Sequence, residues 1–334
     1  MQHAGINIGY GHTKLRTSRG YQSFPSIIAK SNDKFIGMGE KRNTIRTQFA
    51  GAEYEIGEDA ALLHNDPTGG KICVPRWMDS LNYQVLRQAT IDILSQESKV
   101  RADKDWALVL GVAVEHYEDQ QYIEELLQVW RGPLVGSHGT INVAEVQAFP
   151  EPLGAYWRLK LADSSLRDTE LDLVVVIDLG YFTTDWLTIS RDIVLPEKSG
   201  GVDQGMFAVY QAMQEILHRD FGITPDLVKI ERQVRQGGNL QFARQSIDRR
   251  LVLQPALDQV LPRIMAAVRK SLGDTSSEQP LFFLTGGGAS FLRAYLRKTL
   301  IQPVIHVSSD SQRDNAEGYW MIARTLEPAS GDSA

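Results

Sequence analysis

The sequence contains a single cysteine, Cys73, among its 334 residues. One cysteine excludes an internal disulfide bond and the zinc sites that are built from several cysteines. We expect Cys73 to be a small buried apolar side chain. The scarcity of cysteine also favours a cytoplasmic protein.

Long apolar runs and an excess of positive charge are also missing. No stretch approaches the ~20 apolar residues that cross a bilayer, and the first residues lack the apolar core of a secretion signal. The 35 Lys and Arg are outnumbered by 41 Asp and Glu, for a net charge of -6. The sequence therefore predicts a soluble globular protein without a membrane partner and without a basic surface for nucleic acid.

The most informative stretch begins with the apolar run Leu173–Ile177, which predicts a buried strand. The polar sequence DLGYFTTD follows at 178–185, and a second apolar run, Trp186–Ile189, comes after it. Strand, glycine turn and strand indicate a hairpin. Its turn carries a carboxylate, a glycine and two hydroxyl groups, which are the groups needed to hold a phosphate and its metal.

The N-terminus contains a weak copy of this hairpin. Residues 6–14 (INIGYGHTK) share Ile, Gly, Tyr and Thr with residues 177–185 (IDLGYFTTD), and Asn7 stands where the second copy has Asp178. The repeat suggests two similar half-molecules, each of which offers one glycine turn to a ligand between them. The alternative is two ordinary hairpins that share turn chemistry.

Three glycines, Gly286 to Gly288, follow an apolar strand at Leu281–Leu284 and open a helix. They permit close approach of a nucleobase or ribose and supply amides at a helix N-terminus. The alternative is a tight strand-to-helix turn. The G-x-x-x-x-G-K-[ST] spacing of a Walker A loop is absent.

Glu151 lies between Pro150 and Pro152, where a predicted strand at Gly139–Phe149 meets a helix. A carboxylate held between prolines can be aimed accurately. The alternative is an acidic residue that complements the dipole of the helix.

Elsewhere strands alternate with helices, which indicates the α/β class with a break near Trp157–Thr169. Residues 34–56 indicate a small irregular β-rich part, and Gly200–Asp203 a turn. The helices predicted with the clearest apolar faces are Asp79–Ser98, Glu118–Trp130, Pro225–Arg235 and Gln254–Leu272, the last one bent or capped near Pro262.

In order and spacing these motifs resemble the actin-like ATPases, the superfamily that also includes chaperone ATPases and sugar kinases. The corresponding segments, from first phosphate hairpin to second connecting helix, are Ile6–Lys14, Glu151–Trp157, Val176–Asp185, Leu284–Leu292 and Asn315–Ala323. The resemblance implies an actin-like (ribonuclease H-like) two-domain fold with a nucleotide cleft between the domains. Domain I would span residues 1–160, with an inserted subdomain at about 31–75 and a returning helix at 315–326, and domain II residues 161–314.

The plasmid-segregating, ParM-type proteins and their archaeal relatives are the branch that the chain resembles most. The supporting residues are Phe24-Pro25-Ser26, the segment Tyr54–Ala60 and the strand Leu108–Val114 followed by Tyr117. The chain departs from the family at Asn7, where the first phosphate turn normally carries Asp, and at Gly111-Val112-Ala113, where this branch often has Gly-x-Pro. Magnesium binding should then be weaker and hydrolysis slower, and Asn7→Asp should strengthen metal dependence or speed hydrolysis.

The resemblance implies roles for particular residues. Asp178, with Asn7, would hold Mg²⁺ through water, and Glu151 would orient or deprotonate the attacking water. The two turns would wrap the phosphates of ATP or ADP, and Lys14 would act as a point charge on them. The residues implied in nucleotide binding are Gly9, Tyr10, Gly11, His12, Thr13, Lys14, Gly180, Tyr181, Phe182, Thr183, Thr184, Gly201, Asp203, Glu231, Gly286, Gly287 and Gly288.

The function implied is an ATPase that polymerises head to tail and segregates plasmid DNA through a DNA-binding adaptor, as the acidic charge balance favours. The alternative is a scaffold of the same fold, of the pilus or division type, that binds ATP and a partner protein without forming filaments. A sugar or small-acid kinase is less favoured, because no dedicated substrate loop is present.

Overall fold

The computed structural model describes residues 1–31, 42–66, 68–99, 105–162, 172–242, 244–273, 280–300 and 303–326. The chain divides into two compact units. Unit 1 comprises Met1–Leu63, Cys73–Thr169 and Gln312–Ala334, and unit 2 comprises His64–Ile72 and Glu170–Ser311. Residues 64–72, which the sequence predicts to belong to the inserted subdomain of the first domain, group with unit 2.

Unit 1 is built on a six-stranded sheet in the order β3-β2-β1-β7-β9-β8. The pairs β1–β7 and β7–β9 are parallel, and the others are antiparallel. The strands are β1 (Gln2–Ile8), β2 (His12–Thr17), β3 (Gly20–Pro25), β7 (Asp105–Val112), β8 (Gly132–Gly136) and β9 (Gly139–Pro150).

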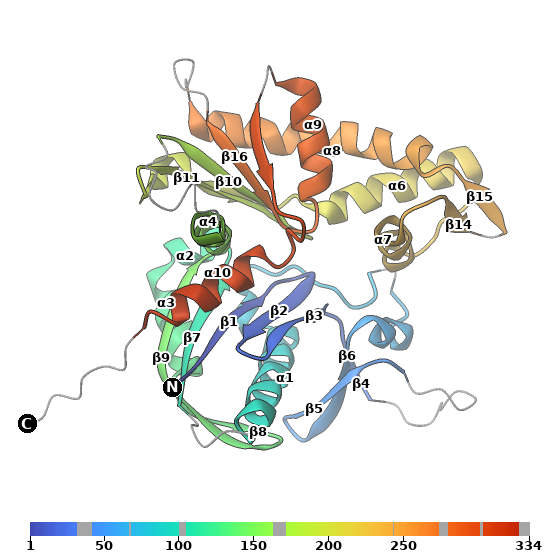
Figure 1. Cartoon of the computed structure of the whole chain (residues 1–334). Coiled ribbons are helices and arrows are strands. Elements are labelled where there is room, and N and C mark those ends of the chain that lie inside the picture. Colours follow the sequence, from blue (N-terminus) through green and yellow to red (C-terminus); the bar gives the residue numbers. More distant parts are fainter. Residues whose placement is uncertain are drawn as a thin grey trace, which may run out of the picture. The chain divides into compact units, whose positions relative to one another are not determined.

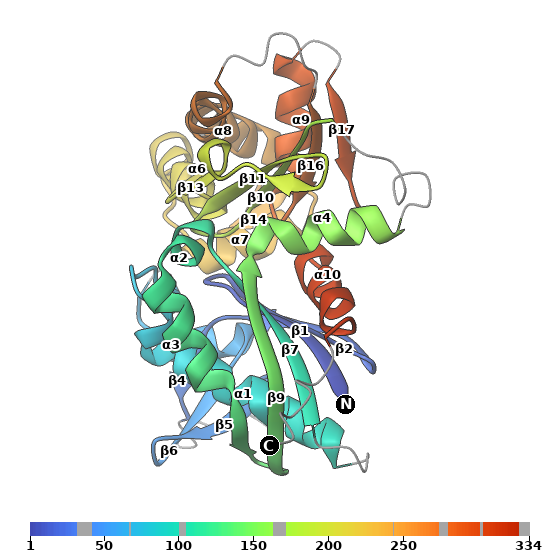
Figure 2. The same ribbon diagram turned by 90° about the vertical axis from the view of Figure 1, so that its left-hand side faces the viewer.

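Helices cover both faces of this sheet (Figures 1 and 2). Figure 2 shows α3 on one side of β7 and β9 and α10 on the other. The helices of unit 1 are α1 (Leu81–Ser98), α2 (Val114–Glu118), α3 (Gln120–Trp130), α4 (Glu151–Ala162) and α10 (Asp314–Ala323), with short 3-10 turns η2 (Glu58–Leu63) and η3 (Trp77–Asp79).

The two faces of β1 explain this arrangement. Ala4, Ile6 and Ile8 alternate along the strand and belong to the apolar core that includes α1 and α3. Gly5 lies on the opposite face, where a Cβ would come within 2.3 Å of the Ala316 carbonyl oxygen. The absence of a side chain at Gly5 therefore lets α10 pack directly on the backbone of β1.

Helices α4 and α10 also cross at glycines. A Cβ on Gly318 would lie 1.8 Å from the carbonyl oxygen of Gly154, so the two backbones meet without side chains between them. An ion pair between Arg158 and the buried Asp314 joins the same helices. The start of α4, where Glu151 lies, is thus held at a fixed place in unit 1.

A smaller antiparallel sheet in unit 1 has the order β4-β6-β5, from β4 (Ile28–Lys30), β6 (Ala52–Ile56) and β5 (Ile45–Phe49). Residues 34–41 of the predicted β-rich part lie outside the described residues. Glu55 on β6 is fully buried and accepts hydrogen bonds from Arg42 (2.7 Å), Thr44 (3.0 Å) and Ser31 (3.2 Å). The Arg42 guanidinium holds the pKa of Glu55 down to about 2.

Unit 2 repeats the plan of unit 1. Its main sheet has the order β12-β11-β10-β16-β17, with the hairpin β10–β11 antiparallel and the pairs β10–β16 and β16–β17 parallel. Because β1–β2 and β10–β11 occupy the same place in the two sheets, the predicted duplication is present in the topology. The strands are β10 (Val174–Leu179), β11 (Thr184–Ser190), β12 (Ile193–Val194), β13 (Gly200–Val202), β16 (Leu281–Thr285) and β17 (Val304–Val307).

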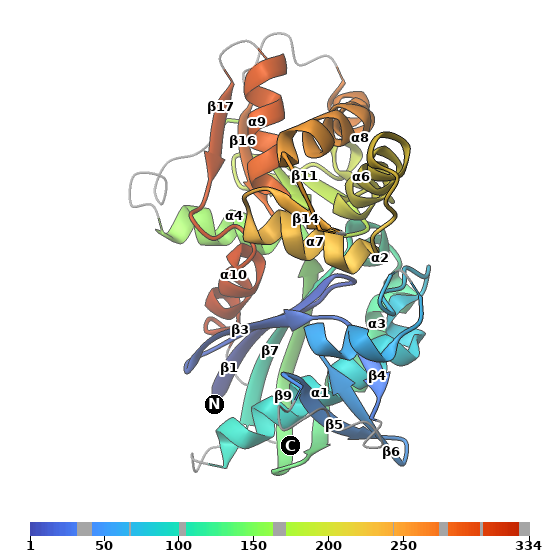
Figure 3. The ribbon, with the colours of Figure 1, turned by 90° about the vertical axis from the view of Figure 1, so that its right-hand side faces the viewer.

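One face of β10, with Val175, Ile177 and Leu179, belongs to a core that the helices of unit 2 complete (Figure 3). These helices are α6 (Met206–Phe221), α7 (Leu227–Gln236), α8 (Arg249–Leu272) and α9 (Ala289–Thr299), with the 3-10 turn η4 (Pro196–Lys198) and the hairpin β14 (Leu240–Phe242) and β15 (Gln245–Ile247).

Two local predictions need correction. The predicted turn at Gly200–Asp203 contains a short strand, because Gly200–Val202 pairs with β11 as strand β13. Of the two alternatives for Pro262, a bend or a cap, the cap is wrong, because α8 continues from Arg249 to Leu272 with Pro255 and Pro262 inside it. Packing of the α8 apolar face in the core outweighs the hydrogen bonds that the prolines remove.

Candidate functional site

The glycine turn of unit 1 joins β1 to β2 and is closed by its own backbone and by Ser26. The Gly9 amide donates to the His12 carbonyl (3.2 Å). The Ser26 hydroxyl donates to the Gly9 carbonyl (2.7 Å), and the Ser26 amide donates to the Gly11 carbonyl (3.0 Å). The hydroxyls of Ser26 and Thr13 also share a hydrogen bond of 3.1 Å. Ser26, one of the residues that carried the resemblance, therefore shapes this turn.

Asn7 and Glu151 meet beside this turn. The Asn7 side chain is fully buried, and its Nδ2 donates to Oε1 of Glu151 at 2.9 Å. Among the described residues, no donor reaches Oδ1 of Asn7. The oxygen is directed toward the turn, since a Cβ on Gly9 would lie 3.6 Å from it. A buried acceptor without a donor is the kind of group that a bound water or ligand would satisfy.

Lys14 is the cross-strand neighbour of Asn7, so both side chains leave the same face of the sheet. Its side chain is buried, and no ion pair or hydrogen bond of its ammonium is found within the described ranges. A buried cation without an anionic partner is costly unless an anion binds. The first turn therefore combines a cation, an open acceptor and a carboxylate on one face of unit 1.

The backbone of Glu151 is fixed from the other side by Tyr319 on α10. The Tyr319 hydroxyl bonds to the carbonyl oxygens of Glu151 (2.9 Å) and Pro150 (3.1 Å). Gly111 on β7 makes room for this contact, because a Cβ there would come within 2.5 Å of the Tyr319 ring and 3.0 Å of Asn7 Nδ2. Glu151 is thus held both through its carboxylate and through its main chain.

The glycine turn of unit 2 has the same closure as that of unit 1. The Gly180 amide donates to the Thr183 carbonyl at 3.0 Å. The first amides of α6 donate to the turn, from Met206 to the Gly180 carbonyl (3.0 Å) and from Phe207 to the Tyr181 carbonyl (2.7 Å). Thr184 is buried and donates to the carbonyl of Gln204 at 2.6 Å. These bonds hold the turn rigidly at the end of β10.

Asp178 and the Gly286–Gly288 turn lie side by side in unit 2. Asp178 is buried on β10 and is in register with Thr285 on β16. Gly286 has φ +84, and a Cβ there would come 2.1 Å from Asp178 Oδ1 and 2.6 Å from the Leu179 carbonyl. A Cβ on Gly288 would meet the Leu179 side chain at 2.4 Å, whereas one on Gly287 would meet nothing within 4 Å. Gly287 is therefore the glycine whose surface is open to a ligand.

The groups beside each turn are of the kind that can face a phosphate or a metal-bound water. Mg²⁺ is usually held by one or two carboxylates together with waters and phosphates, not by a cage of protein ligands. In the described part of the chain, no group of three or more His, Cys, Asp or Glu could hold a metal alone. Asp178 in unit 2 and the open oxygen of Asn7 in unit 1 are each an oxygen group that can bind a water molecule on such a metal.

Glu231 and Tyr181, two of the predicted nucleotide-binding residues, contact Lys71 within unit 2. Lys71 Nζ lies 2.6 Å from Oε2 of Glu231, and it lies 3.8 Å from the centre of the Tyr181 ring. Both partners of the ion pair are buried. The Tyr181 ring also packs on Phe182 and Phe207, and burial raises the pKa of Tyr181 well above its usual range. Through the Tyr181 ring, the side chains of Lys71 and Phe207 contact and stabilise the second glycine turn.

The remaining predicted residues of unit 2 lie near β11. Gly201 is paired with Asp185, and a Cβ on it would lie 3.0 Å from Asp185 Oδ1. Asp203 follows β13 and is exposed. Both stay predictions as nucleotide contacts.

Tyr10 occupies in the first turn the position that Tyr181 has in the second. Its hydroxyl donates to the Val74 carbonyl at 3.0 Å, and its ring packs on Trp77 at 4.7 Å between centroids. Burial, with a smaller effect of Cys73, raises the pKa of Tyr10 above its usual range. Cys73 itself is exposed, so the prediction of a buried cysteine was wrong. Cys73 lies in the segment after Lys71, which has no regular secondary structure.

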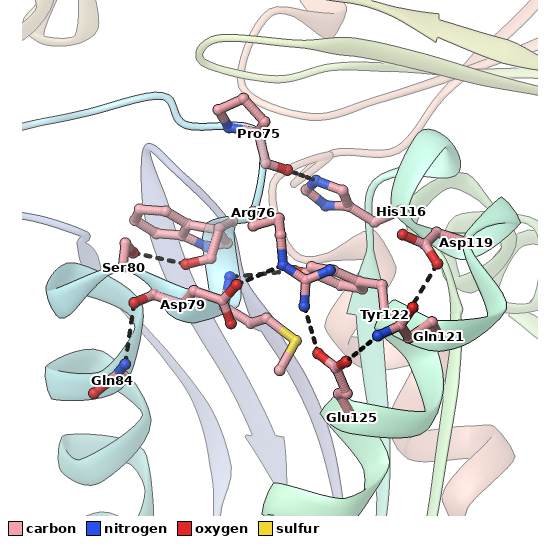
Figure 4. A network of polar contacts seen from close by, with 12 residues as sticks. Pro75, Arg76, Asp79, Ser80, Gln84, His116, Asp119, Gln121, Tyr122 and Glu125 are labelled. Carbon is pink, nitrogen blue, oxygen red and sulfur yellow. Dashed lines mark hydrogen bonds and ion pairs between the residues drawn. The ribbon is translucent and has the colours of Figure 1, made fainter.

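The chain after Val74 is fastened to α2 and α3 by a surface network (Figure 4). Arg76 pairs with Asp79 (2.5 Å) and with Glu125 on α3. The His116 ring bonds to the Pro75 carbonyl at 2.7 Å and stacks on Tyr122 at 4.5 Å. These contacts fix the segment whose Val74 carbonyl receives the Tyr10 hydroxyl.

Sequence reasoning missed Ser26 as a turn-closing residue, Tyr319 and Lys71. Tyr319 lies in the predicted second connecting helix without being singled out, and Lys71 lies in no motif. Their partners are 168 and 160 residues away along the chain. The Ser26 hydroxyl contacts span 17 residues to Gly9 and 13 to Thr13, and they depend on the pairing of β2 with β3. Only the tertiary structure brings these groups to the turns.

Comparisons with known proteins agree with this architecture. Residues 5–154 match the family described as actin-like proteins, N-terminal domain, and residues 176–298 match the C-terminal domain of archaeal MreB-like actin homologues. No curated protein matches the sequence. Within the described residues, no helix has the length and apolar character to span a bilayer.

Solved structures with the same fold cover nearly the whole chain. The archaeal actin homologue Ta0583 is 19% identical, with a TM-score of 0.77 over 98% of this chain and 100% of that one. Its complex with ADP is 20% identical, with a TM-score of 0.74 over 98% and 100%. A ParM from Clostridium botulinum, solved as a 15-stranded filament, is 21% identical, with a TM-score of 0.74 over 97% and 99%.

Proposed function

Because the chain belongs to the actin-like proteins, we propose that it binds and hydrolyses ATP with Mg²⁺ and assembles into filaments. The observation that carries the proposal is the pair of equivalent glycine turns, each closed by the same backbone bond and each beside a buried polar side chain, Asn7 or Asp178. Each turn supplies backbone amides, and Lys14 supplies a charge for phosphate oxygens.

In this proposal Glu151 orients the attacking water and accepts its proton. Asp178 and Asn7 bind water on Mg²⁺, which would neutralise charge on the phosphates when bound. The adenosine lies on the backbone of Gly287, the open member of its turn. The bound ADP of the archaeal actin homologue and the filament of the clostridial ParM support the nucleotide and the assembly respectively.

We further propose that the filaments act in the cytoplasm and move plasmid DNA through a separate adaptor protein. The net charge of -6 supports an adaptor, because direct binding of DNA requires a surface rich in Lys and Arg. The contact that builds the filament would be head to tail between copies of the chain.

Two measurements on the purified protein test the proposal, namely phosphate release and sedimentation with ATP and Mg²⁺. We expect phosphate release and sedimentation with ATP and Mg²⁺, and we expect neither of them when EDTA is present. Nucleotide binding without phosphate release or sedimentation would instead favour a scaffold that binds ATP and a partner protein. Absence of nucleotide binding would contradict both functions.

Two substitutions test the residue roles. Glu151→Ala should leave nucleotide affinity within a few fold and lower turnover by about 10²-fold or more, because it removes only the base. Asp178→Ala should abolish the response of turnover to Mg²⁺. Loss of ATP binding in the first variant, or unchanged magnesium dependence in the second, would refute the assigned role.

A further inference from the structure

Asn7 stands where the actin-like family normally has aspartate. The structure shows that its two polar atoms have different tasks. Nδ2 donates to the Glu151 carboxylate at 2.9 Å, and Oδ1 has no donor among the described residues. The orientation of the amide follows from its partner, because an ionised carboxylate accepts hydrogen bonds and cannot donate them.

The surroundings hold Asn7 in this place. Its side chain is 0% exposed, and its strand is paired on one side with Lys14 and on the other with Gly111. A Cβ on Gly111 would lie 3.0 Å from Asn7 Nδ2, so the glycine leaves the space that the amide group fills. The site is therefore built around an amide that bridges β1 to the start of α4.

We propose that Asn7 is a positioning residue for Glu151, and that it replaces rather than weakens the function of an aspartate in this chain. The inference rests on the proposed function, in which Glu151 orients the attacking water. Of the side chains with this shape, only an amide can donate to the Glu151 carboxylate and still present an acceptor to a bound water. An aspartate would present two acceptors and would place two carboxylates at hydrogen-bond distance.

This geometry reverses the expected effect of Asn7→Asp. The sequence alone favours faster hydrolysis, whereas the contact with Glu151 predicts slower hydrolysis. The new carboxylate repels Glu151 and releases it from its position, and losses of about 10- to 100-fold are typical when such a supporting bond is broken. ATP affinity should change by only a few fold, because Asn7 is not proposed to contact the nucleotide directly.

The experiment compares wild type, Asn7→Asp, Glu151→Gln and the double variant Asn7→Asp/Glu151→Gln in single-turnover hydrolysis, ATP affinity and urea unfolding. The double variant exchanges donor and acceptor, so the Gln amide can donate to Asp. We expect it to regain unfolding stability relative to Asn7→Asp but no hydrolysis, because Glu151 is missing. A purely structural role for Asn7 would instead leave the single-turnover rate of folded Asn7→Asp at the wild-type value.

A matched control is Asn142→Asp, which makes the same change at an exposed pair. Asn142 donates to Asp105 at 2.8 Å on the surface of the same unit, and we expect neither hydrolysis nor stability to change measurably. If Asn7→Asp hydrolyses ATP at least as fast as wild type, the inference is overturned. If the wild-type protein hydrolyses no ATP, the proposed function fails, and the bond is judged by the stability cycle of the two single variants and the double variant. Additive effects in that cycle would overturn the inference as well.

Discussion

Gly286 is under a constraint that Gly287 does not share. Its φ of +84 lies in the left-handed region, and a Cβ would press on Asp178 Oδ1 at 2.1 Å. Gly287, the next residue, has an open surface and no such neighbour within 4 Å. One glycine is thus required by the fold, and the other is available to a ligand.

Gly286→Ala should lower the free energy of unfolding by about 3 kcal/mol, from backbone strain and the contact with Asp178. Gly287→Ala should change it by about 0.5 kcal/mol or less. If adenosine lies on Gly287, the second variant should nevertheless weaken ATP binding. Urea unfolding and titration with a fluorescent ATP analogue measure the two effects, and equal destabilisation by both variants would contradict this account.

At the scale of elements, the buried pair of Lys71 and Glu231 ties residues 64–72 to helix α7 within unit 2. The ammonium also lies 3.8 Å over the Tyr181 ring, beside the second glycine turn. A buried ion pair adds little net stability relative to apolar residues, but removal of one partner leaves a buried charge. The pair therefore acts as a constraint on where this segment lies.

Lys71→Met should destabilise the protein by about 3–5 kcal/mol, and Lys71→Met/Glu231→Leu should recover most of that loss. Lys229→Met is the control, since Lys229 pairs with Asp226 at the exposed start of the same helix, and its effect should be within about 0.5 kcal/mol. Urea unfolding checks all three variants. A double variant as unstable as Lys71→Met would show that packing, not charge pairing, dominates at this position.

The small sheet β4-β6-β5 should be sensitive to acid through Glu55. Its pKa is lowered to about 2 in the folded chain from an ordinary 4.5, mainly by the hydrogen bond from Arg42. A depressed carboxyl pKa contributes stability above pH 4.5, and this contribution is lost as the pH falls from 4.5 toward 2.

Glu55→Gln should therefore be less stable than wild type at pH 7, and the difference should shrink between pH 4.5 and pH 2. Glu53→Gln, at an exposed pair with Arg46, should show no comparable dependence. Thermal melting across this pH range is the measurement. A gap between wild type and Glu55→Gln that stays constant with pH would exclude the charge of Glu55 as its cause.

At the scale of the whole molecule, two units of equivalent topology each carry one glycine turn. The proposed filament would form with ATP and disassemble after hydrolysis, because hydrolysis changes the ligand that the turns bind. In this proposal Glu151 is needed for disassembly, which follows hydrolysis, but not for assembly.

Glu151→Gln should assemble with ATP and Mg²⁺ as wild type does, but its filaments should persist. Light scattering should rise and then decay in wild type as ATP is consumed, and should stay high in the variant. Electron microscopy of the same samples identifies the scattering species. If the light scattering of Glu151→Gln decays at the wild-type rate, disassembly does not depend on hydrolysis by Glu151, and the prediction is wrong.

The sequence by itself determined the local features of this protein. The runs before Asp178 and Gly286 predicted buried strands, and the repeated hairpin predicted two similar units, because apolar periodicity and turn chemistry act over a few neighbouring residues. The order of these motifs also carried the resemblance to the actin-like superfamily, and the family matches confirm that the chain is actin-like.

Only the tertiary structure decided which groups meet. The bond between Asn7 and Glu151 spans 144 residues, the Tyr319 contact with Glu151 spans 168, and Lys71 reaches Glu231 across 160. Such pairs leave no periodic signal, because they arise when separate strands and helices pack around one core. The same packing exposes Cys73 and gives Asn7 a donor's role that its place in the motif did not reveal.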